Sequence, residues 1–519
     1  MLSTVDFGGK PFHFIGIGGI GMSALARILI ELKLPVSGSD AKLNHITQQL
    51  QDLGATIFSP QKADNLNPSP QPVDQDVVAP TTTAFAAPTV SSNVQAAALE
   101  TSHLETGHTL TLPARPLTTA ALPQVVCSTA IQPDNVEYQA ALELGCPILH
   151  RSDLLAALMT RYRSVAVAGT HGKTTTSSLI GHLLYQTQLD PTLIIGGEVQ
   201  GLNTNARLGQ GDYLVAEADE SDGSLVKFQP HIGIVTNIEL DHPDHYTDLD
   251  QLVATFEQFA QHAQILIGSV DCATVRERLP LTTTYSLVPG ATADYTVDQV
   301  HYAGSGTTAR VWERGKLLGS VTLQLLGSHN LSNALAAIAT GRHLGLEFAA
   351  IATALASFTG VRRRFEDRGS ARGITLIDDY AHHPSEIRVT LAAARLQVTS
   401  NVAPEKTQYQ RVVAIFQPHR YSRTRALLNE FAQSFKAADV VVLCDIYSAG
   451  EASDGQTTGQ DLVDATRQHH ANVHYCQSLS DLAPWLANYL QPGDLALFLG
   501  AGNLNQTIPS VLDQLQSVA

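Results

Sequence analysis

The stretch AGTHGKTTTSSLI, residues 168–180, indicates how the middle of the chain folds. The run SVAVAG (164–169) before it has the apolar, β-branched character of a buried strand, and the residues after Lys173 fit a helix. A coincidental Gly-Lys-Thr in a strand–helix turn is the alternative, but the strand before it and the helix after it argue against that interpretation. The stretch therefore predicts a strand, a glycine loop and a helix, as in a nucleotide-binding α/β domain.

The predicted loop has the chemistry of a phosphate cradle. Backbone amides freed by its two glycines, together with the N-terminus of the following helix, can hold phosphate oxygens. Lys173 would reach the β- and γ-phosphates of ATP, and the hydroxyl of Thr174 would hold Mg²⁺. Only two residues separate the glycines, whereas the common loop has four residues before its Gly-Lys. The predicted ATP-binding residues are Gly169, Thr170, His171, Gly172, Lys173, Thr174 and Thr175.

Strand and helix patterns alternate on both sides of this loop. Short β-branched runs such as FHFIGI (12–17), RVVAIF (411–416) and DLALFL (494–499) stand between helical stretches, which predicts parallel sheets. A chain of 519 residues is too long for one hydrophobic core. The sequence therefore predicts an α/β protein of about three domains.

Composition restricts the classes of function. Hydrophobic content of 44% and charged content of 15% are ordinary for a soluble protein, and a net charge of −16 argues against a nucleic-acid partner. The five cysteines are scattered without a CxxC pair, which fits a reducing compartment and gives no sign of a zinc site. No apolar run approaches a membrane span and no signal peptide is visible, so we expect a cytoplasmic protein without a membrane partner.

Residues 67–123 break the pattern. They hold eight of the 24 prolines and no lysine, and they are rich in Thr, Ser and Ala. Because proline donates no amide hydrogen and resists both helix and central strand, we expect a loop or disordered insertion. A partner-binding segment is the alternative.

Carboxylates follow two further strands. DYLVAEADESD (212–222) places Glu217 at a strand end, and VTNIELDHPDHY (235–246) supplies Asn237, Glu239, Asp241 and His242 after another strand. Mg²⁺ prefers hard oxygen ligands, so Glu217 is predicted to bind metal. The sequence leaves His242 open between a metal ligand and a packing residue.

The N-terminal segment GIGGIG (16–21) matches the dinucleotide fingerprint G-x-G-x-x-G, with Asp40 about twenty residues later. These glycines indicate only that a diphosphate approaches a helix N-terminus. NAD, FAD and a UDP-sugar each carry a diphosphate, so the motif leaves the ligand open.

Three more polar clusters lie in the last third of the chain. GVRRRFEDRG (360–369) could be a solvated basic loop. FQPHRYSRTR (416–425) and DDYAHHPSE (378–386) each follow a predicted strand, where ligands of parallel sheets bind. Arginine forks at such a place could converge on an anion. The candidate residues are Asp378, Asp379, Tyr380, His382, His383, His419, Arg420 and Arg423.

Together these motifs resemble the ATP-dependent amino-acid ligases of bacterial peptidoglycan synthesis. The similarity spans nearly the whole chain outside residues 67–123, in the family's order. The matching segments are HFIGIGGIGMSALA, SGSD, AGTHGKTTT, EADESD, TNIELDH, GSHNLSNALAA, RRF, DDYAHHP, FQPHRYSRTR, YSAGE and GAGN.

The resemblance implies an α/β fold of three domains: a Rossmann-like UDP-sugar domain (1–160), a central P-loop-type ATPase domain (161–358) and a Rossmann-like amino-acid domain (359–519). It implies that ATP and Mg²⁺ serve to join L-alanine to the lactyl carboxylate of UDP-N-acetylmuramate through an acyl phosphate. We expect a monomer or weak homodimer.

The resemblance also assigns residues. Gly18, Gly19 and Gly21 would face the diphosphate, with Ser39 and Asp40 near the uridine. Asn330 and Arg364 would contact ATP, while Thr174, Glu217 and His242 would hold metal. Tyr380, His382, His419, Arg420 and Arg423 would frame the reacting carboxylate and the incoming alanine. The residues expected to be catalytic are Lys173, Glu217, His242, His382, Arg420 and Arg423.

Other functions remain open at this point. A related recycling ligase joins a whole peptide to the same UDP-sugar, and only the acceptor would separate the two. Sister ligases carry a carbamylated lysine, and LVATFEQFAQHAQ (252–264) has no lysine, which favours the alanine branch. An NAD-dependent oxidoreductase would explain GIGGIG but would leave Lys173 and Glu217 without a role. A non-catalytic nucleotide-binding module would not need so many polar residues at strand ends.

Overall fold

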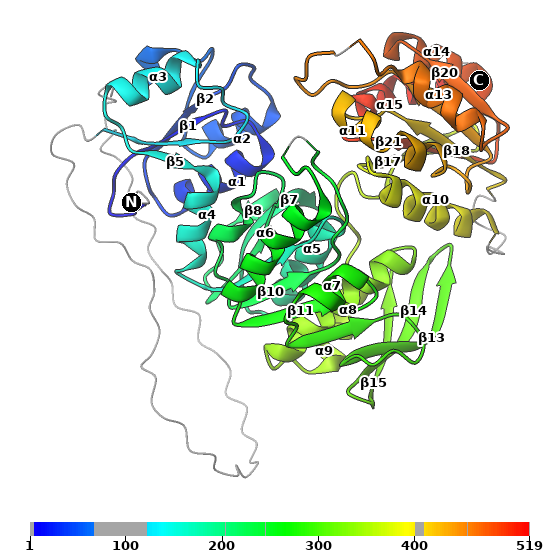
Figure 1. The fold of residues 1–519 in the computed structure, drawn as a ribbon, viewed down its shortest axis with the longest axis horizontal. Coiled ribbons are helices and arrows are strands. Elements are labelled where there is room, and N and C mark those ends of the chain that lie inside the picture. The colour runs from blue at the N-terminus through cyan, green and yellow to red at the C-terminus, as the bar shows by residue number, and fades with distance from the viewer. Residues whose placement is uncertain are drawn as a thin grey trace, which may run out of the picture.

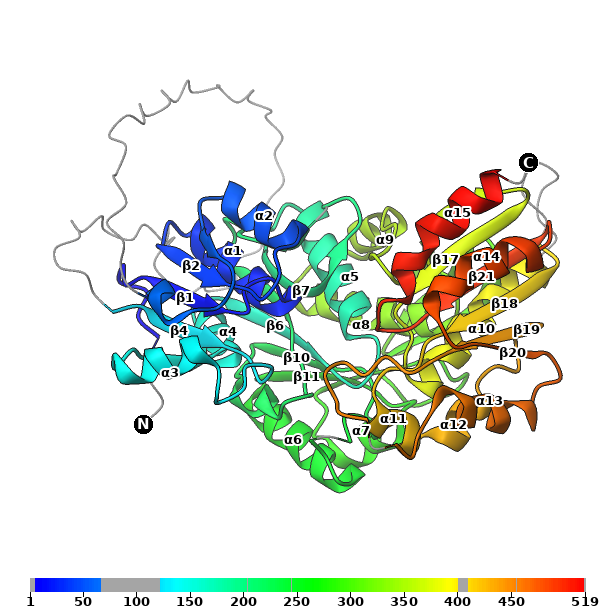
Figure 2. The same ribbon diagram turned by 90° about the horizontal axis from the view of Figure 1, so that it is seen from above.

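The computed structural model describes residues 5–66, 122–202, 204–243, 245–399, 409–453 and 455–517. Three separate sheets organise the chain, and the N-terminal and C-terminal domains lie on either side of the central one (Figures 1 and 2). The predicted α/β fold in three domains is confirmed. Apart from its last two residues, the predicted insertion at 67–123 lies outside the described residues.

The N-terminal sheet has five parallel strands in the order β3-β2-β1-β4-β5. Because the chain leaves β1 for one side of the sheet and later returns to the other, a switch point lies beside β1, where ligands bind in such folds. The strands are β1 (Phe12–Ile15), β2 (Val36–Ser39), β3 (Thr56–Phe58), β4 (Gln124–Cys127) and β5 (Ile148–His150), and the helices are α1 (Ile20–Glu31), α2 (His45–Asp52), η1 (Ala63–Leu66), α3 (Val136–Glu143) and α4 (Arg151–Met159).

The central sheet has ten strands in the order β15-β14-β13-β12-β11-β10-β6-β9-β7-β8. Strands β6 (Arg163–Ala168), β9 (Tyr213–Glu217), β10 (Ile232–Val235), β11 (Ile265–Ser269) and β12 (Thr283–Ser286) are parallel. The remaining strands are β7 (Thr192–Val199), β8 (Thr204–Arg207), β13 (Tyr295–Ala303), β14 (Gly306–Glu313) and β15 (Lys316–Leu323), and the helices are α5 (Lys173–Gln186), η2 (Ser224–Lys227), α6 (Leu249–His262), α7 (Ala273–Arg278), α8 (Ser328–His343) and α9 (Phe348–Ala356).

The expectation of parallel sheets is wrong for part of this domain. Strands β13, β14 and β15 pair antiparallel, and so do β7 and β8. Only two residues separate β13 from β14 and β14 from β15. So short a connection can join only antiparallel neighbours, because a parallel crossover needs a dozen residues or more.

The C-terminal sheet has six strands in the order β16-β17-β21-β18-β19-β20, with β16 antiparallel to β17. Every residue of β17, β19 and β21 is buried, as expected for strands covered by helices on both faces. The strands are β16 (Glu366–Ala371), β17 (Ile374–Asp379), β18 (Arg411–Phe416), β19 (Val440–Cys444), β20 (Val473–Cys476) and β21 (Asp494–Leu499), and the helices are α10 (Pro384–Thr399), α11 (Tyr421–Ala426), α12 (Leu428–Ala432), α13 (Gly459–Arg467), α14 (Leu479–Tyr489), η3 (Leu504–Thr507) and α15 (Ile508–Ser517).

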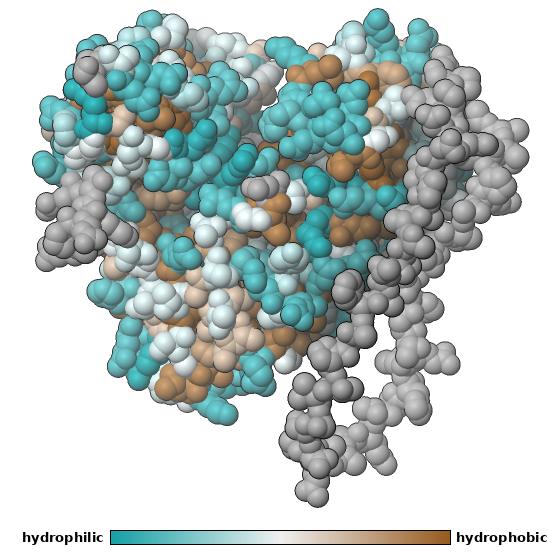
Figure 3. Space-filling view, turned by 180° about the vertical axis from the view of Figure 1, so that it is seen from behind, coloured by the Kyte–Doolittle hydropathy of each residue, from teal (hydrophilic) through white to brown (hydrophobic). Residues whose placement is uncertain are grey.

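Apolar packing follows the sheets. One core runs without a break from the N-terminal domain into the central domain, from Phe12 to Leu279, whereas the C-terminal sheet has separate cores on its two faces. Polar and apolar residues are interspersed over the face drawn in Figure 3. Within the described residues, no helix has both the length and the apolar character needed to cross a bilayer.

Candidate active site

The predicted phosphate loop connects β6 to α5. Gly169 and Gly172 have φ angles of +129° and +81°, in the region that favours glycine. A Cβ built on Gly169 would lie 2.1 Å from Oγ1 of Thr236, and one on Gly172 would lie 2.6 Å from Oδ1 of Asn333. The loop therefore requires both glycines, and the strand–loop–helix prediction is confirmed.

Lys173 lies at the centre of this loop. Its Nζ donates hydrogen bonds to the carbonyl oxygens of Gly169 (2.7 Å) and Thr170 (3.1 Å) and to Oε1 of Glu220 (2.9 Å). Burial disfavours the charged ammonium, but the carboxylates of Glu220 and Asp219 outweigh that effect and raise the pKa of Lys173. The ammonium is therefore held charged beneath the loop, where phosphate oxygens would approach it.

Glu220 is a site residue that the sequence analysis missed. Its side chain is fully buried, and its Oε2 has no hydrogen-bond partner in the described part of the chain. The sequence holds one signal for it: in EADESD, Glu220 lies three residues after Glu217, just beyond the end of β9.

Two groups of donors suited to a metal lie beside Lys173. Thr174 Oγ1 donates to Oε1 of Glu217 at 3.0 Å, and burial raises the pKa of Glu217. In the second group, Asp219, Glu220 and His242 bring one ligand atom each within 4.8 Å of one another. Carboxylates and a hydroxyl fit Mg²⁺, which prefers hard oxygen ligands, and the unpartnered oxygen of Glu220 fits a cation too. Metal binding by Thr174, Glu217 and His242 stays a prediction.

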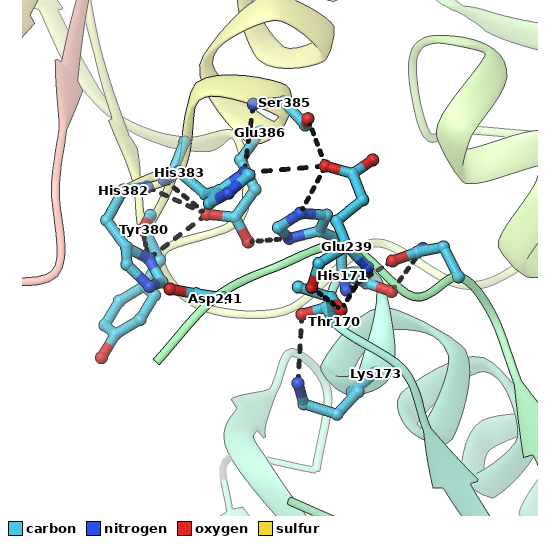
Figure 4. Close-up of polar contacts among 12 residues, drawn as sticks. Thr170, His171, Lys173, Glu239, Asp241, Tyr380, His382, His383, Ser385 and Glu386 are labelled. Atoms are coloured by element: carbon cyan, nitrogen blue, oxygen red, sulfur yellow. Dashed lines mark hydrogen bonds and ion pairs between the residues drawn. The ribbon is translucent and has the colours of Figure 1, made fainter. Parts of the chain in front are cut away.

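His171 connects the phosphate loop to the C-terminal domain (Figure 4). Its Nδ1 lies 3.3 Å from Oε1 of Glu386, its Nε2 lies 3.4 Å from Oε2 of Glu239, and its ring centre lies 4.6 Å from that of His383. Burial disfavours the charged imidazolium, but the two carboxylates raise the pKa of His171 to about 9. Ser385 Oγ also donates to Glu239 at 2.6 Å, so the C-terminal domain is docked on the loop.

A second contact between these domains is a buried ion pair. Arg423 Nε donates to Oδ1 of Asp241 at 2.8 Å, and both side chains are about 95% buried. Arg423 Nη1 also lies 3.3 Å from Nδ1 of His419, and Arg420 Nη1 lies 3.7 Å from Oε1 of Glu451. In this structure Arg423 binds the carboxylate of Asp241. Its predicted contact with an amino acid stays a prediction.

The two histidines predicted near the acceptor lie together. The ring centres of His382 and His419 are 6.1 Å apart, and Tyr380 stacks edge-on against His382. Burial lowers the pKa of His382 to about 3 and that of His419 to about 4. Both rings are therefore neutral at pH 7.

A cavity of about 540 Å³ lies between the phosphate loop and the C-terminal domain. It is lined by loop residues His171, Gly172 and Thr175 and by the two predicted nucleotide contacts, Asn330 and Arg364. Its volume is within the range of small-molecule sites. Asp379 lines the same cavity, and burial raises its pKa to about 6. Asn333 also lines it and is a residue that the sequence analysis did not single out.

The glycine loop after β1 lies apart from this cavity, in the N-terminal domain. Gly18 donates its backbone N–H to Oδ2 of Asp40 at 2.9 Å, and α1 begins at Ile20 without a side-chain cap or an acidic residue in its first turn. The first-turn amides suit an anion such as a diphosphate. The contacts predicted for Gly18, Gly19 and Gly21 with a diphosphate, and for Asp40 with the uridine, stay predictions.

Ser39 has a different environment from the one predicted. Its side chain is fully buried, and its hydroxyl donates to the buried carboxylate of Glu137, which also lies 3.0 Å from Nε2 of His13. The hydroxyl is used inside the domain, so its position gives no support to the predicted contact with uridine.

Three family models match the chain in succession. They are described as "Mur ligase family, catalytic domain" (residues 11–163), "Mur ligase middle domain" (167–341) and "Mur ligase, glutamate ligase domain" (363–502). The chain belongs to the Mur ligase family.

Curated Mur ligases resemble the chain over their full length. A UDP-N-acetylmuramate–L-alanine ligase of Synechococcus elongatus is 58% identical over 513 residues, which cover 99% of this chain and 98% of that protein. The protein of the same name from Nostoc punctiforme is 57% identical, with the same coverage. This similarity supports an enzymatic role. It favours a ligase over an NAD-dependent oxidoreductase and over a non-catalytic nucleotide-binding module.

Solved Mur ligase structures share the fold. The crystal structure of UDP-N-acetylmuramate–alanine ligase from Thermotoga maritima has a TM-score of 0.75 and 26% identity, covering 98% of this chain and 100% of that chain. A murein peptide ligase from Psychrobacter arcticus has a TM-score of 0.66 over the same shares but 22% identity, which shows the fold alone.

Proposed function

We propose that the chain is an ATP-dependent ligase that joins L-alanine to the lactyl carboxylate of UDP-N-acetylmuramate in the cytoplasm, for peptidoglycan synthesis. The observation that carries this proposal is the geometry around Lys173. A charged lysine in a glycine loop lies beside a set of metal-type donors, with a second domain docked over it. The identity of 58% over nearly the full chain to a ligase of that name supports the substrates.

The chemical problem explains this geometry. A carboxylate is a poor electrophile, so the ligase transfers the γ-phosphoryl group of ATP to a lactyl carboxylate oxygen and releases ADP. The alanine ammonium loses a proton, and its neutral amine attacks the acyl carbon. The tetrahedral intermediate then loses a second N–H proton and expels phosphate. Lys173 would neutralise charge on the β- and γ-phosphate oxygens during the first step.

Bound Mg²⁺ would shield the phosphate charges from the incoming carboxylate. Thr174 and Glu217 would hold it, together with His242 and the carboxylates of Asp219 and Glu220. Asn330 and Arg364, which line the cavity beside the loop, would contact the nucleotide.

The docked C-terminal domain would do two things. It would exclude water, which otherwise hydrolyses an acyl phosphate. It would also frame the acceptor with Tyr380, His382, His419, Arg420 and Arg423. The low pKa values keep both imidazoles neutral, so they add no charge that would repel an incoming ammonium group.

The acceptor separates this proposal from the recycling ligase. Phosphate release should be measured with ATP, UDP-N-acetylmuramate and, in turn, L-alanine, glycine, L-serine and an L-alanyl tripeptide. We expect L-alanine to give the highest kcat/KM. A higher kcat/KM for the tripeptide would instead assign the recycling reaction.

A further inference from the structure

Arg151 lies where the N-terminal domain meets the central domain. It is the first residue of α4, the helix that leads from the N-terminal sheet toward β6. A Cβ built on Gly21, in the glycine loop of α1, would lie 3.6 Å from Nη1 of Arg151. The guanidinium therefore borders the loop that is predicted to hold a diphosphate.

The other side of the same guanidinium faces the acidic motif after β9. Nη2 donates to Oδ2 of Asp219 at 3.1 Å and to Oδ2 of Asp222 at 2.9 Å. Within the described residues, both hydrogen bonds of this guanidinium use Nη2, and Nη1 on the side of Gly21 donates to no protein atom. A donor directed at the glycine loop is thus left for a ligand.

Asp219 connects Arg151 to the phosphate loop. Asp219 is followed by Glu220, whose Oε1 accepts a hydrogen bond from Nζ of Lys173 at 2.9 Å. The acidic motif therefore contacts a cation at the glycine loop and a cation at the phosphate loop. Asp222, with only 4% of its side chain exposed, holds the guanidinium through a hydrogen bond from Nη2.

The glycine loop itself offers a diphosphate only neutral donors. The first turn of α1 has backbone amides and no basic side chain in the segment from Gly16 to Gly21. A diphosphate has two negative charges, and a charged N–H donor forms a strong hydrogen bond to a phosphate oxygen. Arg151 supplies a cation beside the loop, next to Gly21.

We propose that Arg151 binds the diphosphate of UDP-N-acetylmuramate and holds the lactyl end of the sugar toward the phosphate loop. This inference rests on the proposed function. A purely structural role, as an ion pair between the two domains, is the alternative, and the same interface contains a control for it. Lys227 Nζ donates to Oδ1 of Asp153 at 2.6 Å, so it also joins the central domain to α4.

The test compares Arg151→Met, Arg151→Lys and Lys227→Met by calorimetric titration with UDP-N-acetylmuramate, UDP and ADP. We expect Arg151→Met to raise the Kd of both UDP ligands at least about tenfold. Arg151→Lys should raise it less, because lysine keeps the positive charge although it lacks the several N–H donors of a guanidinium. Lys227→Met should change it by less than about twofold, and the Kd of ADP should stay unchanged in every variant.

Each other outcome has a definite meaning. A wild-type Kd for UDP-N-acetylmuramate in Arg151→Met would overturn the inference and leave Arg151 as a structural ion pair. If Arg151→Met weakened the binding of UDP-N-acetylmuramate but not that of UDP, Arg151 would not contact the diphosphate, and the inference would be overturned. If Arg151→Met also lost ADP binding through misfolding, a wild-type Kd in a folded Arg151→Lys would overturn the inference. Wild-type protein that bound no UDP-N-acetylmuramate would contradict the proposed function itself.

Discussion

Lys173 and Glu220 form a buried pair whose charges depend on each other. The side chain of Glu220 is fully buried and that of Lys173 is 13% exposed. Removing one member of such a pair leaves an uncompensated buried charge, at a cost of about 3–5 kcal/mol. A loss of activity on substituting Lys173 therefore has to be separated from a loss of stability.

We predict that Lys173→Ala lowers kcat by about a thousandfold or more, because the charge on the γ-phosphoryl group loses its main cationic partner. The double variant Lys173→Ala/Glu220→Gln should recover most of the lost stability but none of the activity. Urea unfolding and phosphate release measure the two effects. Substantial turnover in either folded variant would contradict the role of Lys173.

We predict that Arg423→Lys raises the KM for L-alanine more than the KM for ATP. Arg423 contacts Asp241 and His419 through different nitrogens of its planar guanidinium. Lysine keeps the positive charge opposite Asp241, but it lacks the fork that could also bind the carboxylate of alanine. Steady-state titration of each substrate, with the others saturating, measures the effect, and His382→Ala should act on the same substrate. An equal rise for all three substrates would show that Arg423 only closes the domains.

At the level of elements, α10 and the phosphate loop are joined through one carboxylate. Glu386 accepts the backbone N–H groups of His382 (2.9 Å) and His383 (3.2 Å) at the start of α10, and it also lies beside His171. The helix start and the loop thus share Glu386. A titrating His171 therefore changes how strongly the C-terminal domain is held on the central one.

We predict that this contact weakens at alkaline pH. The pKa of His171 rises on folding from about 6.5 to about 9, so its stabilisation is complete below pH 6.5 and is lost as pH rises through 9. The largest difference is about 3 kcal/mol. Unfolding free energies of wild type and His171→Gln, measured from pH 6 to 9.5, should converge at the alkaline end. A difference that stays constant with pH would show that His171 is not charged in the folded protein.

For the whole molecule, sequence patterns predicted local structure better than contacts between domains. The phosphate loop, its glycines and the strand-end positions of Glu217 and Tyr380 follow from local periodicity and glycine spacing. The pairing of Asp241 with Arg423 joins residues 182 positions apart, and no local pattern carries that information. The same holds for Ser39, whose hydroxyl pairs with Glu137, 98 positions away in the chain.

We predict that replacing residues 67–121 by about 15 residues of Gly and Ser leaves a folded, active ligase. The flanking segments have their own contacts: Leu66 is buried, and β4 pairs with β1 from Gln124 onward. Circular dichroism, the melting temperature and the KM for UDP-N-acetylmuramate measure the outcome. A selective loss of UDP-sugar binding would assign the segment to the site.

The most direct test of the proposed reaction uses UDP-N-acetylmuramate with ¹⁸O in its lactyl carboxylate, together with ATP and L-alanine. If the carboxylate attacks the γ-phosphoryl group, expulsion of phosphate carries one carboxylate oxygen away. We therefore expect mass spectrometry to show one ¹⁸O in each released phosphate and a UDP-sugar product heavier by one alanine residue. Phosphate without ¹⁸O, or turnover without an alanine-containing product, would contradict the account.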